Sequence, residues 1–168
     1  MRFVTTGWDR PVRRLIVLAL VLALLSPACA SHDHSESGSD AETTEGTIPG
    51  SPANASEADR DIAIDASDEL RFSPSSVELD SGEVVTFVVH NGGQTDHEFV
   101  LGDEAYQKAH ESDMTSGHHM TDSENAVTVG PGETKELTWS FTDTGELLYG
   151  CHEPGHYDGG MVGTIEVG

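Results

Sequence analysis

The chain has 168 residues, of which 30 are acidic and only 8 are Lys or Arg, so its formal net charge at pH 7 is -22. So acidic a surface repels nucleic acids and anionic lipid headgroups and favours basic or metal-cation partners, although the same charge also serves solubility. The length suits one folded domain with a leader and a linker rather than two domains.

Residues 1–28 have the pattern of an export signal. Basic residues precede an apolar run over 15–25 that is short for a membrane span, and small residues follow it. Cys29 comes next, and the preceding residues resemble the motif of bacterial lipoproteins, although Ser26 stands where that motif usually has Leu. We expect lipidation of Cys29 and a membrane anchor, with ordinary cleavage and secretion as the alternative.

Residues 29–59 contain almost no large apolar side chains and are mainly Ser, Glu, Asp, Thr, Gly, Pro and Ala. Such a segment cannot bury enough surface to offset its ordering entropy, so we expect a disordered acidic linker. His32 and His34 could hold a metal ion loosely there, but in a flexible linker we expect them to be solvated.

Residues 60–168 change to short runs of Val, Ile, Leu and Phe separated by Gly, Pro, Asn and Asp. Val77 and Leu79 alternate with polar residues, which is typical of a half-buried strand. Many short strands with turn residues between them indicate one all-β domain, an antiparallel β-sandwich. We expect strands at about 61–65, 69–72, 76–80, 83–90, 97–101, 126–129, 134–142, 145–151 and 161–167.

Residues 102–125 interrupt the strands. The segment 103–111 starts with acidic residues and continues with good helix formers, so it predicts a short helix. The loop after it is rich in copper-binding side chains, which raises the hypothesis of a second, labile copper site, with a solvated loop as the preferred alternative. Its candidate ligands are His110, Met114, His118, His119 and Met120.

Near the C-terminus, Cys151, His156 and Met161 follow one another at intervals of five residues. Thiolate and thioether suit Cu(I) and imidazole suits Cu(II), so this mixture predicts a site that serves both oxidation states of copper. A second histidine should come from a neighbouring strand, and His97 is the candidate, with His90 as the substitute. The alternative is that the cysteine and methionine are core residues and His156 an ordinary loop histidine.

The spacing C-x4-H-x4-M between two strands, together with the upstream Asn91-Gly92 and His97, resembles the cupredoxin (type 1, blue copper) family, in its plastocyanin/azurin-like branch. The resemblance covers about the last two-thirds of the chain. It implies a Greek-key sandwich that holds one copper ion by His97, Cys151 and His156, with Met161 as the weak axial ligand. It also implies that electrons pass through the edge of His156.

These features predict a single-electron carrier of the cell envelope, with copper homeostasis or tolerance as the alternative function. His152 follows the cysteine and should point away from the metal, since neighbours in a strand alternate faces. A cluster of further copper ions would need at least two His-x-His motifs, and the sequence offers no such pair, so we do not expect an enzyme. We expect an exported protein, monomeric, lipid-anchored or periplasmic, that meets a cytochrome or copper protein as redox partner.

Overall fold

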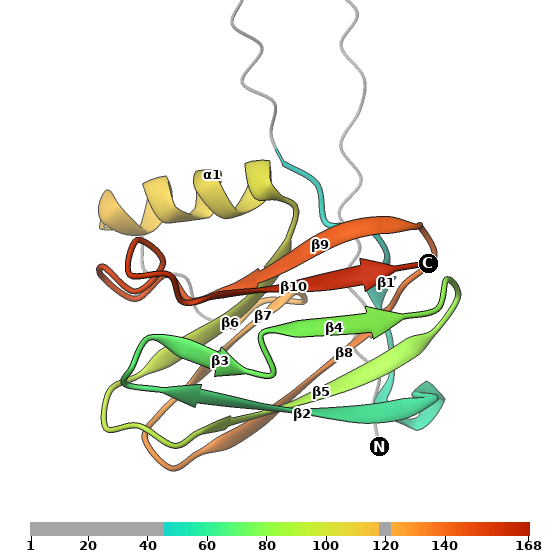
Figure 1. Cartoon of the computed structure of the whole chain (residues 1–168), viewed down its shortest axis with the longest axis horizontal. Coiled ribbons are helices and arrows are strands. Elements are labelled where there is room, and N and C mark those ends of the chain that lie inside the picture. Colours follow the sequence, from blue (N-terminus) through green and yellow to red (C-terminus); the bar gives the residue numbers. More distant parts are fainter. Residues whose placement is uncertain (1–45, 118–121) are drawn as a thin grey trace, which may run out of the picture. The chain divides into compact units, whose positions relative to one another are not determined.

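The computed structural model describes residues 46–117 and 122–168, which form two five-stranded sheets packed face to face with one α-helix (Figure 1). One sheet has the strand order β1-β8-β5-β2-β3, and the other has the order β4-β10-β9-β6-β7. The elements are β1 (Ser51–Pro52), η1 (Ala55–Glu57), β2 (Arg60–Ser67), β3 (Arg71–Ser73), β4 (Ser76–Leu79), β5 (Val84–Asn91), β6 (His97–Gly102), α1 (Glu104–Thr115), β7 (Ala126–Val129), β8 (Thr134–Ser140), β9 (Gly145–Gly150) and β10 (Val162–Val167).

The predicted all-β sandwich with an inserted helix is confirmed, but the strands are not all antiparallel as predicted. β2 pairs with β5 in parallel, and β4 pairs with β10 in parallel. The cause is the path of the chain: after β2 and β3 it crosses to the other sheet as β4 and then returns as β5 beside β2. A strand that returns in this way runs in the same direction as its neighbour.

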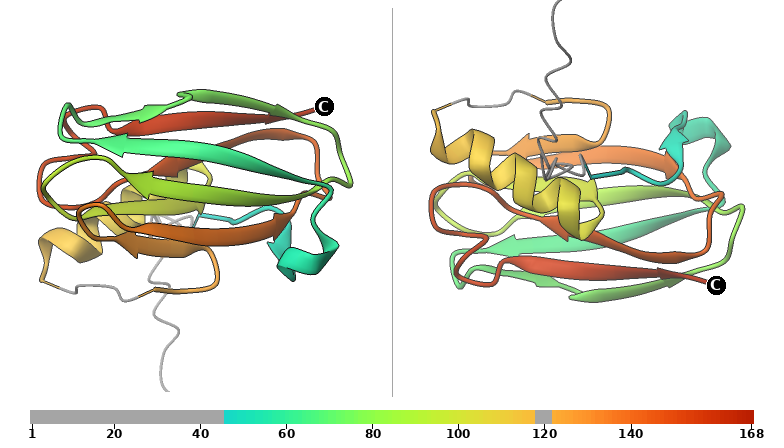
Figure 2. Two further views of the ribbon diagram at one scale, coloured as in Figure 1. Left: turned by 90° about the horizontal axis from the view of Figure 1, so that it is seen from below. Right: turned by 90° about the horizontal axis from the view of Figure 1, so that it is seen from above.

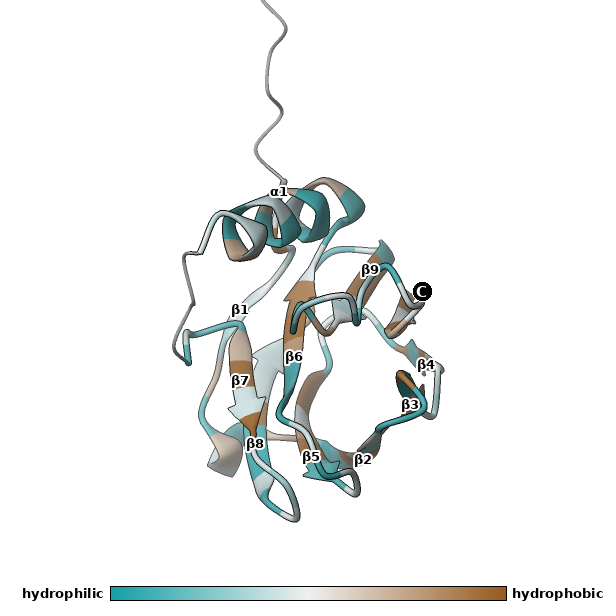
Figure 3. Ribbon diagram, turned by 90° about the vertical axis from the view of Figure 1, so that its left-hand side faces the viewer, coloured by the Kyte–Doolittle hydropathy of each residue, from teal (hydrophilic) through white to brown (hydrophobic). Residues whose placement is uncertain are grey.

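Aromatic rings fill the space between the two sheets. Phe99 of β6 contacts Phe72, Phe87 and Tyr149, with ring centroids 5.9, 5.2 and 5.1 Å away. Phe141 meets Phe87 edge-on at 6.1 Å, a favoured arrangement for aromatic pairs. Hydrophobic colour lies mainly on the strands and hydrophilic colour on the connections and much of the helix (Figure 3).

β6 is buried along its whole length because both of its faces are covered. Phe99 and Leu101 belong to the core between the sheets. The alternate residues, Glu98 and Val100, face the other way, where α1 lies across β6 and β9 (Figure 2). This strand, which lies between β9 and β7, begins at His97 and separates the core from the layer under the helix.

The helix α1 begins one residue later and ends four residues later than the predicted segment 103–111. Asp103 is its N-cap, and its carboxylate accepts a hydrogen bond from the Tyr106 amide at 2.7 Å. The same carboxylate accepts hydrogen bonds from the amide and hydroxyl of Thr47, at 2.8 and 2.6 Å. Asp103 thus starts the helix and also holds the segment that precedes β1.

Residues 46–59 belong to the predicted linker, yet they are ordered against the domain. β1 pairs with β8 and becomes the edge strand of that sheet, and the Trp139 indole donates a hydrogen bond to the Pro49 carbonyl at 2.8 Å. Local composition could not show these distant partners. The predicted signal segment 1–28, Cys29 and the two histidines of the linker lie outside the described residues. None of the helices among the described residues is long and apolar enough to cross a membrane.

Candidate metal centre

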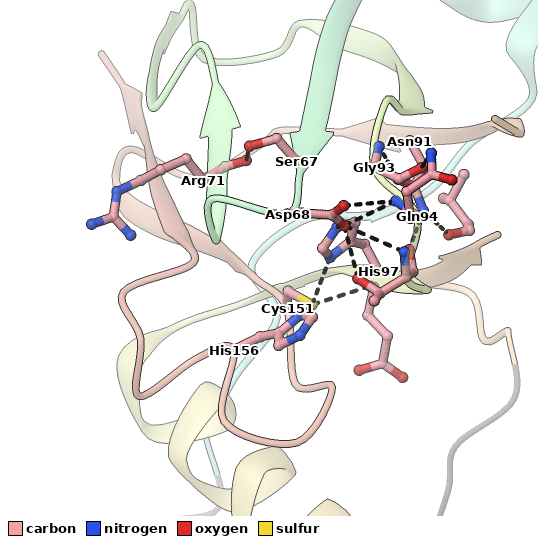
Figure 4. A network of polar contacts seen from close by, with 12 residues as sticks. Ser67, Asp68, Arg71, Asn91, Gly93, Gln94, His97, Cys151 and His156 are labelled. Carbon is pink, nitrogen blue, oxygen red and sulfur yellow. Dashed lines mark hydrogen bonds and ion pairs between the residues drawn. The ribbon is translucent and has the colours of Figure 1, made fainter. Parts of the chain in front are cut away.

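Three predicted ligands come together at one end of the sandwich (Figure 4). His97 is the first residue of β6, Cys151 follows directly on β9, and His156 lies in the turn that leads to β10. One donor atom from each side chain lies within 4.8 Å of the other two. His97 and Cys151 are fully buried, and His156 is partly exposed.

The distances between these donor atoms fit a shared metal ion. The Cys151 sulfur lies 3.4 Å from Nδ1 of His156 and 3.9 Å from Nδ1 of His97. Metal bonds to nitrogen and thiolate are about 2.0–2.3 Å long, so two donors of one ion lie roughly 3–4 Å apart. Two imidazoles and one thiolate are the donor set of a type 1 copper site.

Met161 lies next to this group. The Cys151 amide donates to the Met161 carbonyl at 3.1 Å, and the Met161 amide donates to the His156 carbonyl at 3.0 Å. The Met161 side chain is fully buried and shares the core cluster that contains Cys151. Met161 therefore lies next to the three donors, and its thioether is the candidate for a weak axial ligand.

The turn between Cys151 and Met161 is closed by its own backbone. The His156 amide donates to the Glu153 carbonyl at 2.8 Å. Gly155 and Gly160 have φ of 81° and 90°, a left-handed conformation that other residues adopt only with strain. Arg71 adds a hydrogen bond from Nη1 to the Gly159 carbonyl at 3.0 Å, so β3 also supports the turn. The position of His156 is thereby fixed by the fold.

Burial governs the protonation of Cys151. It raises the pKa of this thiol to about 12, although a hydrogen bond from the Glu98 amide to the sulfur, at 3.3 Å, acts in the opposite direction. A metal ion must therefore displace the thiol proton when it binds. The same amide donor remains in place to stabilise the resulting thiolate.

Asp68, in the turn after β2, lies behind His97. Its Oδ1 is 3.7 Å from Nε2 of the imidazole, on the side away from Cys151. The carboxylate also accepts hydrogen bonds from the Gln94 amide, at 2.9 Å, and from the Thr95 hydroxyl, at 3.0 Å. The hydrogen bond from Gln94 contributes most to holding the pKa of Asp68 below its usual value, so the group is an anion. The pKa of His97 is lowered, mainly by burial and to a smaller extent by the nearby His156.

Asn91, at the end of β5, shapes the loop that delivers His97. Its side-chain amide donates to the carbonyls of Thr95 and Val129, at 2.7 and 2.8 Å, and its Oδ1 accepts from the Gly93 amide at 2.8 Å. The residue is completely buried, so these bonds replace the water that its polar atoms would otherwise need. This side chain and Asp68, which accepts hydrogen bonds from Gln94 and Thr95, together set the conformation of residues 91–95.

The other predicted histidines lie elsewhere. His90 is exposed and lies 3.2 Å from Asp65, away from the three donors. His152 points away from the metal centre, as expected, and is buried under α1. His110 and Met114 are also buried on that side, on the inner face of the helix. His118, His119 and Met120 lie outside the described residues.

Sequence reasoning missed Asp68, Gln107 and the two acidic residues Glu98 and Glu111. Glu98 offered a weak signal, because it follows His97 within a strand and must therefore face the opposite side. Asp68 offered none, since its role depends on a contact between two loops that are distant in sequence.

Comparisons with known proteins agree with this geometry. The family model of copper-binding proteins of the plastocyanin/azurin family matches residues 58–168. The chain belongs to this family. The family binds copper, and the Cys/His/His group with its neighbouring methionine fits one type 1 copper ion. The expected resemblance to the cupredoxins is thus confirmed.

Similar proteins match over almost the whole chain. A copper-resistant cuproprotein CopI of Rubrivivax gelatinosus is 37% identical over 91% of this chain and 94% of its own. A protein of the same name from Vibrio cholerae serotype O1 is 34% identical over 92% of this chain and 98% of its own.

Solved structures show the same fold. Reduced auracyanin from Roseiflexus castenholzii, at 23% identity, has a TM-score of 0.58 over 66% of this chain and 98% of its own. Auracyanin A of Chloroflexus aurantiacus, described as a blue copper protein, has a TM-score of 0.56 and 26% identity over 64% of this chain and 98% of its own.

Proposed function

We propose that this protein protects the cell from excess copper, binding the ion in the cell envelope at His97, Cys151 and His156 with Met161 as axial ligand. The observation that carries the proposal is a buried, preformed donor group in a chain that resembles copper-resistant cuproproteins along more than nine-tenths of its length. Copper tolerance, which the sequence indicated as the alternative to an electron carrier, thereby becomes the leading function.

The ligand set supports binding of both oxidation states. The Cys151 thiolate and the Met161 thioether favour Cu(I), and the two imidazoles favour Cu(II). Copper bound there would be able to take up or give up a single electron. His97 and Cys151 are closed off from water, whereas His156 reaches the surface. Copper therefore enters and leaves beside His156, which also offers the edge at which an acceptor protein would dock.

We further propose that the chain is exported and acts as a binding protein rather than an enzyme. Relatives that match more than nine-tenths of the chain are named copper-resistant cuproproteins, and the leader resembles a lipoprotein signal. A lipid anchor on Cys29 would hold the monomeric domain at the outer face of the membrane through the acidic segment that follows it.

Growth at inhibitory copper concentrations tests the tolerance function. A deletion strain should grow poorly and should recover with the wild-type gene, because the domain removes free copper. Cys151→Ser should fail to restore growth, while His90→Gln, a change at an exposed histidine outside the site, should restore it. Restoration by Cys151→Ser, or normal growth of the deletion strain, would refute the proposal.

A single-electron carrier is the second candidate, favoured by the fixed donor geometry. Ligands held by two strands and a closed turn need little rearrangement when the oxidation state of copper changes. Such a carrier would exchange electrons with a cytochrome or a copper protein through His156. Reversible redox cycling with slow copper loss would support the carrier, whereas transfer of copper to a competing acceptor within minutes would support tolerance.

A further inference from the structure

The face of α1 that packs on the sheet is polar, which is unusual for a helix on a β-sandwich. Its buried residues are Gln107, His110 and Met114. Across from them lie the buried side chains of Glu98, from β6, and His152, from the turn after β9. Burying polar groups costs free energy unless each of them has a partner.

Most of these polar atoms do have partners. Gln107 Nε2 donates to the Val100 carbonyl at 2.8 Å, which orients the amide so that its Oε1 accepts from His152 Nε2 at 2.6 Å. His152 Nδ1 lies 2.7 Å from Oε2 of Glu111. Both ring nitrogens of His152 are therefore engaged, and it is not free to bind a metal ion.

Two atoms under the helix have no hydrogen-bond partner: Oε2 of Glu98 and Nε2 of His110. Glu98 is 4% exposed and His110 is 5% exposed, so bulk water does not reach the two atoms. The two atoms face each other at 3.7 Å. That distance exceeds the usual 2.7–3.2 Å of a hydrogen bond. It does fit two ligands of one ion, since metal bonds to nitrogen and to carboxylate oxygen are each about 2.0–2.2 Å long.

Glu98 also lacks a Lys or Arg partner among the described residues. Among the described residues Arg60, Lys108 and Lys135 pair with other carboxylates, and Arg71 donates to backbone carbonyls. A second acidic residue, Glu111, lies in the same cluster. Burial raises the pKa of Glu111, and the negative charge of Asp158 raises it further. A buried carboxylate without a paired cation is strongly unfavourable, and a metal ion removes that penalty.

We propose that Glu98 Oε2 and His110 Nε2 bind a second metal ion under α1, separate from the Cys151 centre. Imidazole and carboxylate together suit a borderline divalent cation, Zn(II) or Cu(II). A cavity of about 40 Å³ lies beside Glu111 and His152, lined also by Met114, Thr115 and Pro154, and has room for a water molecule. The inference does not rest on the proposed copper tolerance.

Zn(II) titration of the protein, with copper already bound at the Cys151 centre, tests this site. Wild type should bind one Zn(II) ion that Glu98→Gln and His110→Gln each weaken by more than tenfold, since loss of even an outer partner of a metal ligand typically costs 10–100-fold. Glu104→Gln on the exposed side of α1 and His90→Gln on β5 are the matched controls, and neither should change binding. Circular dichroism should first establish that every variant is folded.

Zn(II) should also raise the melting temperature of wild type and not of the two variants, because a ligand that binds only the folded state stabilises it. Crystals of wild-type protein soaked in Zn(II) and measured above the zinc absorption edge give a readout that needs no variant. An anomalous peak between Glu98 and His110 is expected. Equal Zn(II) binding by wild type and both variants, or no peak at saturating Zn(II), would show that the two residues form only an ion pair.

Discussion

The backbone amide of Glu98 donates a hydrogen bond to the sulfur of Cys151 over 3.3 Å, while the Glu98 side chain lies on the opposite face of β6, under α1. Because adjacent residues of a strand alternate faces, one short strand serves both layers. His97 lies on the core side beside Cys151, the Glu98 amide donates to the Cys151 sulfur, and the Glu98 carboxylate lies 3.7 Å from His110. Any change in β6 is therefore expected to reach the metal centre.

Asp68→Asn should weaken Cu(II) binding about tenfold and raise the reduction potential. The carboxylate behind His97 makes the imidazole a better donor, and this favours Cu(II) more than Cu(I). Asparagine keeps Oδ1, which accepts from the Gln94 amide and the Thr95 hydroxyl, both at 3.0 Å, and it loses the charge together with the second acceptor of the Gln94 amide. Competition with a chelator measures the affinity, and voltammetry measures the potential.

Asp65→Asn is the control for this change. Asp65 is an exposed carboxylate beside His90, so its loss should leave the copper affinity and potential unchanged. Equal effects of the two substitutions would mean that Asp68 acts only through the overall charge of the domain.

Asn91→Ala should lower the free energy of unfolding by about 3 kcal/mol, because it leaves buried backbone groups of Gly93 and Val129 without partners. Denaturant titration of the metal-free protein measures the loss. Asn54→Ala removes an exposed asparagine that caps η1 and should cost about 1 kcal/mol. A loss at Asn91 no larger than that at Asn54 would contradict the role given to Asn91 in shaping the loop.

Copper binding should become stronger as the pH rises. The pKa of Cys151 is raised to about 12 by burial, so the metal-free thiol keeps its proton at neutral pH and copper must displace it. Each pH unit makes that displacement about tenfold easier, so the apparent affinity should increase about tenfold per unit between roughly pH 7 and 9. Chelator competition across this range measures the slope, and a slope that persists in Cys151→Ser would show that another group releases the proton.

Much of the fold could be predicted because strand alternation is a local property. The segment 126–129 coincides with β7, and the other expected strands overlap the observed ones. The parallel pairing of β2 with β5 could not be predicted, since it depends on how the chain crosses between the sheets. The pairing of β1 with β8 was missed for a similar reason: Ser51–Pro52 has no strand pattern of its own and depends on a distant edge.

In the candidate site, too, residues close together in the sequence could be predicted and contacts between distant elements could not. Cys151, His156 and Met161 share one turn, so their spacing alone predicted that they would meet. His97 required a guess about a distant strand, and the structure places it beside Cys151. Asp68 and the pair of Glu98 and His110 were not found, because contacts between side chains of different elements leave no trace in local composition.

Visible absorption and electron paramagnetic resonance of the Cu(II)-loaded protein, measured beside Cys151→Ser, test the central claim that Cys151 binds copper. We expect an intense thiolate-to-copper band and narrow copper hyperfine splitting in wild type, and the loss of both in the variant, because serine cannot supply a thiolate. A pale spectrum that is the same in both proteins would contradict the claim and would mean that copper binds at other side chains.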